Sequence, residues 1–187
     1  MSRREEIIQI AARLFKEKGY HAATLQDIAD ELQLSKPALY YHIKSKEDVL
    51  CEICNRGISA AIEGLQAILA SGATPQEKFR SILKNHIQVA MNHLEAMAVT
   101  YHEVTALPPE EYRRFAEQIV RYQSLIEGVY REGVESGVFR PVDPAIAVNG
   151  VLGMVNWLYR WYNPNGAWSP EEISAVLVEI AEGGICN

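Results

Sequence analysis

The fold is decided by residues 24–50, TLQDIADELQLSKPALYYHIKSKEDVL. The first part of this stretch repeats apolar side chains at helical spacing, at Leu25, Ile28, Ala29 and Leu32. Thr24 precedes the stripe and can cap a helix, and Asp27 three residues later can complete a capping box. Because the stripe ends at residues 33–34, the pattern predicts a helix of about two turns.

Two further helix starts follow at short intervals. Ser35 can cap a second helix, whose first turn tolerates Pro37 because the backbone N–H groups there lack intrahelical partners. Ser45 can cap a third helix, with Asp48 at its third position. A helix, a short turn and a helix form the layout of a helix-turn-helix, whose second helix lies in the major groove of DNA.

The charge pattern agrees with an approach to DNA. Residues 33–46 contain Lys36, Lys44, Lys46 and His42 but no acidic residue. The first fifty residues are balanced in charge, so the rest of the chain carries the net charge of −6. Because an acidic protein is repelled by DNA unless its cations gather where phosphates arrive, this cationic segment is the expected point of contact.

Residues 4–50 resemble the DNA-binding domain of the TetR/AcrR transcriptional regulators. The matching pieces are AARLFKEKGY, TLQDIA and SKPALYYHIKSKEDVL, with Ile43 at a position where the family more often has Phe. The resemblance implies a repressor that binds double-stranded operator DNA as a homodimer and is released by a small molecule. It also implies which residues meet DNA. The groove-facing set is Lys36, Pro37, Ala38, Tyr41 and His42, and the phosphate-binding set is Thr24, Tyr40 and Lys46.

Length and composition favour one or two intracellular domains. The chain has 187 residues, of which 48% are hydrophobic, and three cysteines without a disulfide-like spacing. Neither a secretory signal nor an uninterrupted apolar run of membrane-spanning length is present in the sequence. We therefore expect a cytoplasmic protein without a membrane segment, a cofactor or a metal. Cys51 and Cys54 lie one turn apart, and without a second pair they are interpreted as packing residues.

Caps and prolines divide the remaining chain into helices. Strong starts occur at residues 74–77, 108–111, 143–144 and 169–172, where a capping residue or a proline opens the segment. With no strand-like alternation, the prediction is an all-α fold of about nine helices. It has a three-helix DNA-binding domain at residues 1–46 and a helical ligand-binding and dimerisation domain at residues 47–187. A helix over residues 45–70 crosses the boundary.

The larger domain is rich in Met and aromatic residues beside polar ones. Such a mixture lines pockets for apolar ligands with one polar end, although aromatic residues at helical spacing are also typical of a core. The predicted pocket comprises Met91, Met97, Tyr101, His102, Tyr122, Ile126, Tyr130, Met154, Trp157 and Trp161. A looser similarity of residues 129–173 to acyl-CoA-responsive TetR-like regulators implies an acyl-CoA or a fatty acid as effector. Arg121, Arg131 or Arg160 would then meet phosphates or form surface ion pairs.

The last two long helices carry more apolar surface than one core needs, which predicts a partner. By the family resemblance they form a four-helix bundle with their copies. The predicted dimer interface is Val148, Val151, Leu152, Val155, Ile173, Val176, Leu177 and Ile180. Two alternatives remain open on the sequence: an all-α enzyme, for which no catalytic motif is found, and a DNA architectural protein without ligand control.

Overall fold

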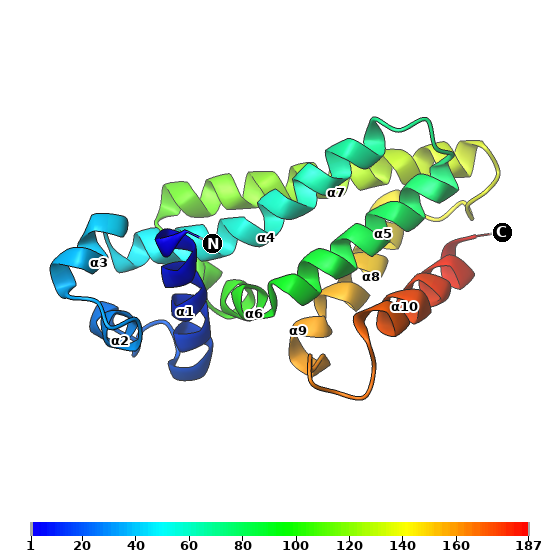
Figure 1. The fold of residues 1–187 in the computed structure, drawn as a ribbon. Helices are drawn as coiled ribbons and strands as arrows, with labels where there is room; N and C mark the ends of the chain where they lie inside the picture. The colour runs from blue at the N-terminus through cyan, green and yellow to red at the C-terminus, as the bar shows by residue number, and fades with distance from the viewer. Residues whose placement is uncertain (1, 187) are drawn as a thin grey trace. The chain divides into compact units, whose positions relative to one another are not determined.

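The computed structural model describes residues 2–186, which form ten α-helices and one 3₁₀ helix without a β-strand (Figure 1). The predicted all-α fold is thus confirmed. In chain order the elements are α1 (Arg3–Lys18), α2 (Leu25–Glu31), α3 (Lys36–His42), α4 (Lys46–Leu69), α5 (Pro75–Asn92), α6 (Leu94–Glu103), η1 (Val104–Ala106), α7 (Pro109–Glu135), α8 (Pro144–Asn156), α9 (Leu158–Trp161) and α10 (Pro170–Ile185).

Local capping explains most of the helix starts. Complete capping boxes open α1 at Ser2, α2 at Thr24 and α10 at Ser169. Because these bonds join residues only three apart, the sequence reveals them directly. The helix predicted to start at residues 143–144 is interrupted at Trp157, which separates α8 from α9.

The first compact unit comprises residues 1–57 and 93–116. Here α1 packs against α2 and α6. Its core includes the fully buried Ile7, Ile28, Leu39 and Ile53, joined by Leu107 from the segment before α7. Packing therefore groups α6 with the N-terminal helices. The boundary between a DNA-binding domain of residues 1–46 and a ligand-binding domain of residues 47–187 stays a prediction.

The second compact unit comprises residues 58–92 and 117–187. Within it α5 packs against α8, α9 and α10. Phe79, Tyr130 and Phe139 form an aromatic cluster, in which the last two rings stack at 5.2 Å between centroids. The Phe139 ring lies directly on Gly133, where a Cβ atom would come within 2.0 Å of the ring. A side chain at residue 133 would therefore displace the ring.

Two helices contribute residues to both units, since α4 and α7 each span a boundary between them. Among the described residues, none of the helices combines the length and the apolar character needed to cross a bilayer.

Candidate functional site

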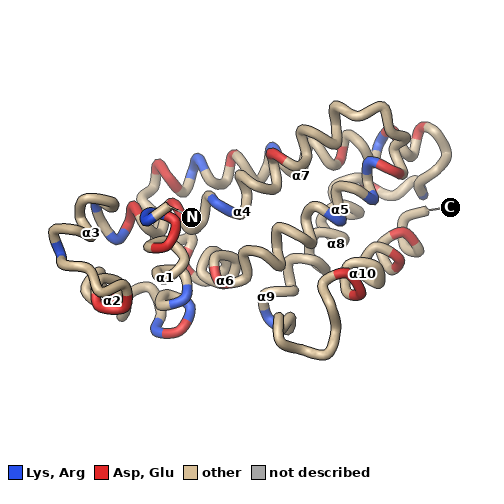
Figure 2. Tube along the Cα trace, viewed as in Figure 1, with Lys and Arg blue, Asp and Glu red and all other residues tan. Residues whose placement is uncertain are grey.

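Helix α3 exposes a face without acidic residues. Leu39 and Ile43 are buried and anchor α3 and the residue after it, while Tyr41 keeps 86% of its surface exposed. Lys36 and Pro37, at the start of the helix, are exposed as well. Along α3 the tube in Figure 2 carries no acidic residue. An anchored helix with a cationic, aromatic outer face is suited to contact nucleic acid.

The turn before α3 depends on an unusual backbone conformation. Gln33 has φ 54°, in the left-handed region that side chains other than Gly seldom adopt. The next N–H group, that of Leu34, donates to the carbonyl of Ala29 at 2.8 Å. This bond closes the turn and sets the direction in which α3 leaves α2.

Arg4 joins the end of α3 to the start of α4. Its guanidinium donates to the carbonyl oxygen of His42, to the Glu52 carboxylate at 2.7 Å and to the Asp48 carboxylate at 3.4 Å. Arg56 also binds Glu52, at 3.3 Å. This cluster could not be predicted from the sequence, because the partners of Arg4 lie 38 to 48 residues away and no local pattern links them.

Two of the predicted phosphate contacts are occupied by the protein itself. The backbone N–H and the hydroxyl of Thr24 both donate to the Asp27 carboxylate, at 2.7 and 2.6 Å. The ammonium of Lys46 donates to the carbonyl of His21 at 3.3 Å and lies 4.5 Å from the centre of the Tyr20 ring. Phosphate binding by these residues stays a prediction, and it would require them to exchange existing bonds.

In the second unit, three polar side chains meet between helices. His86 of α5 contacts the Tyr122 hydroxyl through Nδ1 at 3.1 Å and the Asn156 Oδ1 atom through Nε2 at 2.8 Å. Burial lowers the pKa of His86 and raises that of Tyr122, so both side chains are neutral at neutral pH. We call these three residues the polar triad.

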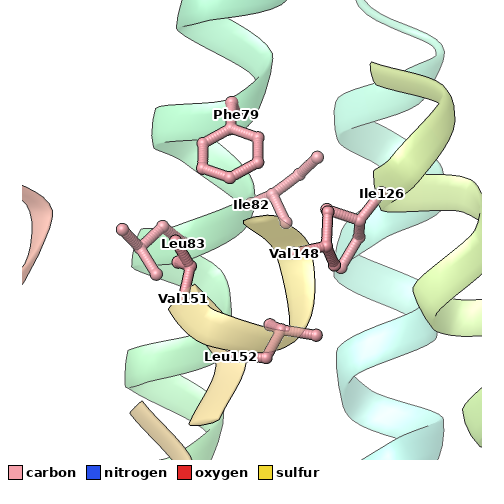
Figure 3. Close-up of a pocket in the computed structure, with 7 residues that line it drawn as sticks. All are labelled: Phe79, Ile82, Leu83, Ile126, Val148, Val151 and Leu152. Carbon is pink, nitrogen blue, oxygen red and sulfur yellow. The ribbon is translucent and has the colours of Figure 1, made fainter. Parts of the chain in front are cut away.

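A small apolar cavity lies among the helices that carry the triad (Figure 3). Its volume is about 10 Å³, hardly enough for one water molecule. Three helices line it: α5, α7 and α8. The lining side chains are Phe79, Ile82, Leu83, Ile126, Val148, Val151 and Leu152.

Comparison with known proteins identifies the family. Residues 7–53 match the model of bacterial regulatory proteins of the tetR family, and residues 72–185 match that of the tetracyclin repressor-like C-terminal domain. The transcriptional repressor KstR2 of Mycolicibacterium smegmatis is 31% identical over 98% of this chain and 91% of its own length. The chain belongs to the TetR family. The predicted resemblance to TetR-type transcriptional regulators is thereby confirmed.

Solved structures of TetR-family proteins share the fold over nearly the whole chain. PfmR from Thermus thermophilus has a TM-score of 0.86 and 33% identity, covering 95% of this chain and 97% of its own. AibR, solved with isovaleryl coenzyme A and operator DNA, has a TM-score of 0.82 and 29% identity, covering 96% and 97% of the two chains.

The ten residues predicted to line a TetR-type effector pocket are divided between the two units, and the pocket itself stays a prediction. Met97, Tyr101 and His102 belong to the first unit, and the other seven belong to the second. In the second unit Met91, Tyr122, Ile126 and Tyr130 are buried, Met154 is half-buried, and Trp157 and Trp161 are exposed.

Of the predicted pocket residues, only Ile126 lines the described cavity, and Tyr122 belongs to the polar triad. Tyr130 has a structural role, because its hydroxyl donates to the carbonyl of Arg140 at 2.9 Å and its ring stacks on Phe139. Sequence periodicity could not separate such a core aromatic residue from a pocket residue, since both face inward.

The predicted dimer interface separates into two groups. Val148 and Val155 are fully buried, Leu152, Ile173 and Leu177 are nearly so, and Val151 is half-buried. These side chains pack within the protomer, and their part in a dimer interface stays a prediction. Val176 and Ile180 remain exposed on α10, by 53% and 57%. Ile146 and Trp157, absent from the predicted set, are exposed on α8 and after it.

Proposed function

We propose that this TetR-family protein is a cytoplasmic repressor that binds operator DNA as a homodimer and leaves it when an effector occupies the second unit. The observation that carries the proposal is the anchored, acid-free helix α3 with Lys36 and Tyr41 on its exposed face. The presence of operator DNA in the AibR structure supports a DNA-binding role for this related chain.

We assign the DNA contacts to the exposed face of α3 and its surroundings. Lys36, Pro37, Ala38, Tyr41 and His42 would face the major groove, with Tyr40 at the phosphates. Thr24 and Lys46 would contact phosphates only after giving up their hydrogen bonds to the Asp27 carboxylate and the His21 carbonyl. Arg4 would act indirectly, by holding the end of α3.

Dimerisation is supported by the apolar residues that α8 and α10 leave exposed. Ile146, Val176 and Ile180 each keep more than half of their surface exposed. A two-fold dimer places two recognition helices on successive half-sites of a palindromic duplex, about 34–36 Å apart or a multiple of that distance.

The effector is proposed to be a small apolar or amphipathic molecule, with an acyl-CoA as the preferred class. The isovaleryl coenzyme A bound to AibR supports this class. The described cavity is lined by hydrocarbon and is built from the same three helices as the polar triad, which matches an apolar ligand with one polar group.

Helix α4 is the proposed link between effector and DNA. In the second unit the Asn85 side chain of α5 donates to the carbonyl of Ala61 at 3.4 Å and lies against Gly64 of α4. In the first unit Arg4 binds the start of the same helix. A displacement of α5 would therefore be carried along α4 toward α3. A coupling of about 1–3 kcal/mol would change DNA affinity by about 5–150-fold.

The proposal is tested by selecting a duplex from a random pool and measuring its affinity by fluorescence anisotropy over a range of salt concentrations. We expect sequence-selective binding that weakens steeply with salt. Lys36→Glu should abolish it. Lys84→Glu, which makes the same charge change at an exposed position of α5, should leave it nearly unchanged. A folded dimer that binds no duplex at low salt would refute the repressor assignment.

A second measurement separates a ligand-controlled repressor from an architectural DNA-binding protein. Isovaleryl coenzyme A and lauroyl coenzyme A are added to the protein–duplex complex. Release of the duplex supports effector control, whereas an unchanged complex with both thioesters supports the architectural alternative.

A further inference from the structure

We propose that the side-chain amide of Asn156 binds the neutral carbonyl oxygen of the effector's acyl group, with the hydrocarbon part of that group in the adjoining cavity. The inference rests on the proposed function, and it names the residue that would distinguish a thioester from a free acid.

The hydrogen bonds of the triad determine which group of Asn156 is left for a ligand. The Oδ1 atom of Asn156 only accepts, so the Nε2 atom of His86 must carry the proton in their 2.8 Å bond. Since His86 is neutral, its Nδ1 atom is then an acceptor, and the Tyr122 hydroxyl donates to it at 3.1 Å. The Nδ2 group of Asn156, with two N–H donors, takes no part in these bonds.

This Nδ2 group lies where another molecule can reach it. Asn156 is half-buried, and no described residue accepts a hydrogen bond from its Nδ2 group. No buried side-chain nitrogen or oxygen among the described residues lacks a partner. The Nδ2 group therefore faces space open to solvent or a ligand, and it is held in a fixed direction through Oδ1.

The triad and the cavity are built from the same three helices. Ile82 precedes His86 by four residues, Leu152 precedes Asn156 by four, and Ile126 follows Tyr122 by four. These offsets each correspond to about one helical turn, or 5.4 Å along the helix. Figure 1 shows α7 running in the opposite direction to α5 and α8, so the three offsets lead in one direction along the helices. A carbonyl at the triad would place its hydrocarbon substituent in the cavity.

The triad favours a neutral group over an anion. None of His86, Tyr122 and Asn156 carries a charge at neutral pH, because burial disfavours the charged forms of the first two. A carboxylate placed there would lose its hydration without gaining a cation, which is costly. The carbonyl of a thioester needs only the N–H donor that Asn156 offers. The site should therefore select acyl thioesters over the corresponding acids.

Because the cavity is small, binding of an acyl chain there would have to move the helices that surround it. At about 10 Å³ the cavity cannot hold even a short acyl chain unless α5, α7 and α8 separate. The neighbour of His86 on α5 is Asn85, whose side chain lies against Gly64 of α4. Separation of the helices would thus move the contact between α5 and α4.

The test is isothermal titration of the full-length protein with isovaleryl coenzyme A, lauroyl coenzyme A, the two free acids and coenzyme A alone. Asn156→Asp keeps an acceptor for His86 and removes both N–H donors. Asn92→Asp is the matched control, because Asn92 is exposed on α5 and its Oδ1 atom likewise accepts from a side chain, that of Gln88 at 3.0 Å.

We expect the wild-type protein to bind at least one thioester about tenfold or more tightly than its acid and than coenzyme A. Asn156→Asp should lose about tenfold in thioester affinity, and Asn92→Asp should match the wild type. Should Asn156→Asp not fold, Tyr122→Phe serves instead. It removes the proton that fixes the imidazole and should also weaken thioester binding.

Equal affinity of wild-type protein and Asn156→Asp for the thioester would overturn the inference. So would equal affinity for acid and thioester, or no binding of either thioester to the wild type. Duplex binding is measured on the same samples. If the wild type binds DNA while the thioester results fail, only this inference is lost. If it binds no DNA, the proposed function itself fails.

Discussion

Replacing Arg4 by Ala should weaken DNA binding without removing any contact to DNA. Arg4 binds the carbonyl of His42 at the end of α3 and the carboxylates of Glu52 and Asp48 on α4. A charge-assisted hydrogen bond is worth about 1.5–3 kcal/mol when buried, and an exposed ion pair about 0–1 kcal/mol. The Arg4 side chain is 40% exposed and that of Glu52 25%, so an intermediate value applies. We expect a loss of about 1–2 kcal/mol in the preference of α3 for its docked orientation.

This loss predicts that DNA affinity falls by about 5–30-fold. Fluorescence anisotropy with the selected duplex measures it, over a series of salt concentrations. Because Arg4 is assigned no phosphate contact, the slope of log affinity against log salt should change little. Circular dichroism confirms that the variant is folded.

The matched control is Arg3→Ala, which removes the same charge at the neighbouring position. Arg3 is 46% exposed and, among the described residues, forms an ion pair only with Glu6, three residues away on the same helix. Such a pair is worth about 0.2–0.5 kcal/mol, so Arg3→Ala should change DNA affinity by no more than about twofold. Equal affinities of the folded Arg3 and Arg4 variants would refute the idea that Arg4 positions α3.

Three further predictions concern stability and assembly. Gly133→Ala should destabilise the protein by about 1–3 kcal/mol in urea unfolding, because the new Cβ atom meets the buried Phe139 ring. Gly128→Ala on the same helix, with open space around it, should stabilise the protein by up to about 1 kcal/mol. Equal effects of the Gly133 and Gly128 substitutions would contradict the packing of Phe139 on Gly133. The pKa of His86 is lowered on folding, so the unfolded chain binds more protons and the free energy of unfolding should fall as pH drops below about 6.5. In urea titrations at a series of pH values, the free energy of unfolding of His86→Gln should decrease less with falling pH than that of the wild type. An unchanged pH dependence would show that His86 does not cause it. Ile180→Asp should shift the protein toward monomer in analytical ultracentrifugation, whereas a fully dimeric variant would exclude this face of α10 from the interface.

Helix starts and the family could be predicted from the sequence because both depend on residues close together in the chain. The capping box of α2, for example, joins Thr24 to Asp27. The residues of α3 expected to face DNA came from the family resemblance, and Tyr41 among them is exposed in the structure.

Contacts between distant residues limited the prediction of the sites. Lys46 was expected at phosphates, and the fold adds a contact between its ammonium and the Tyr20 ring that no local sequence pattern shows. Val148 and Val155 of α8 were expected at the dimer interface, and the structure shows that both are fully buried within the protomer. Periodicity identifies an inward face without telling which neighbour covers it.

The sequence by itself determined an all-α TetR-family chain with an acid-free recognition helix, because periodicity, capping and local charge act over a few residues. Only the tertiary structure decided that Arg4 holds α3 and that His86 orients Asn156. Arg4 and His42, like His86 and Asn156, are tens of residues apart, and their hydrogen bonds form only after packed helices bring them within about 3 Å of one another.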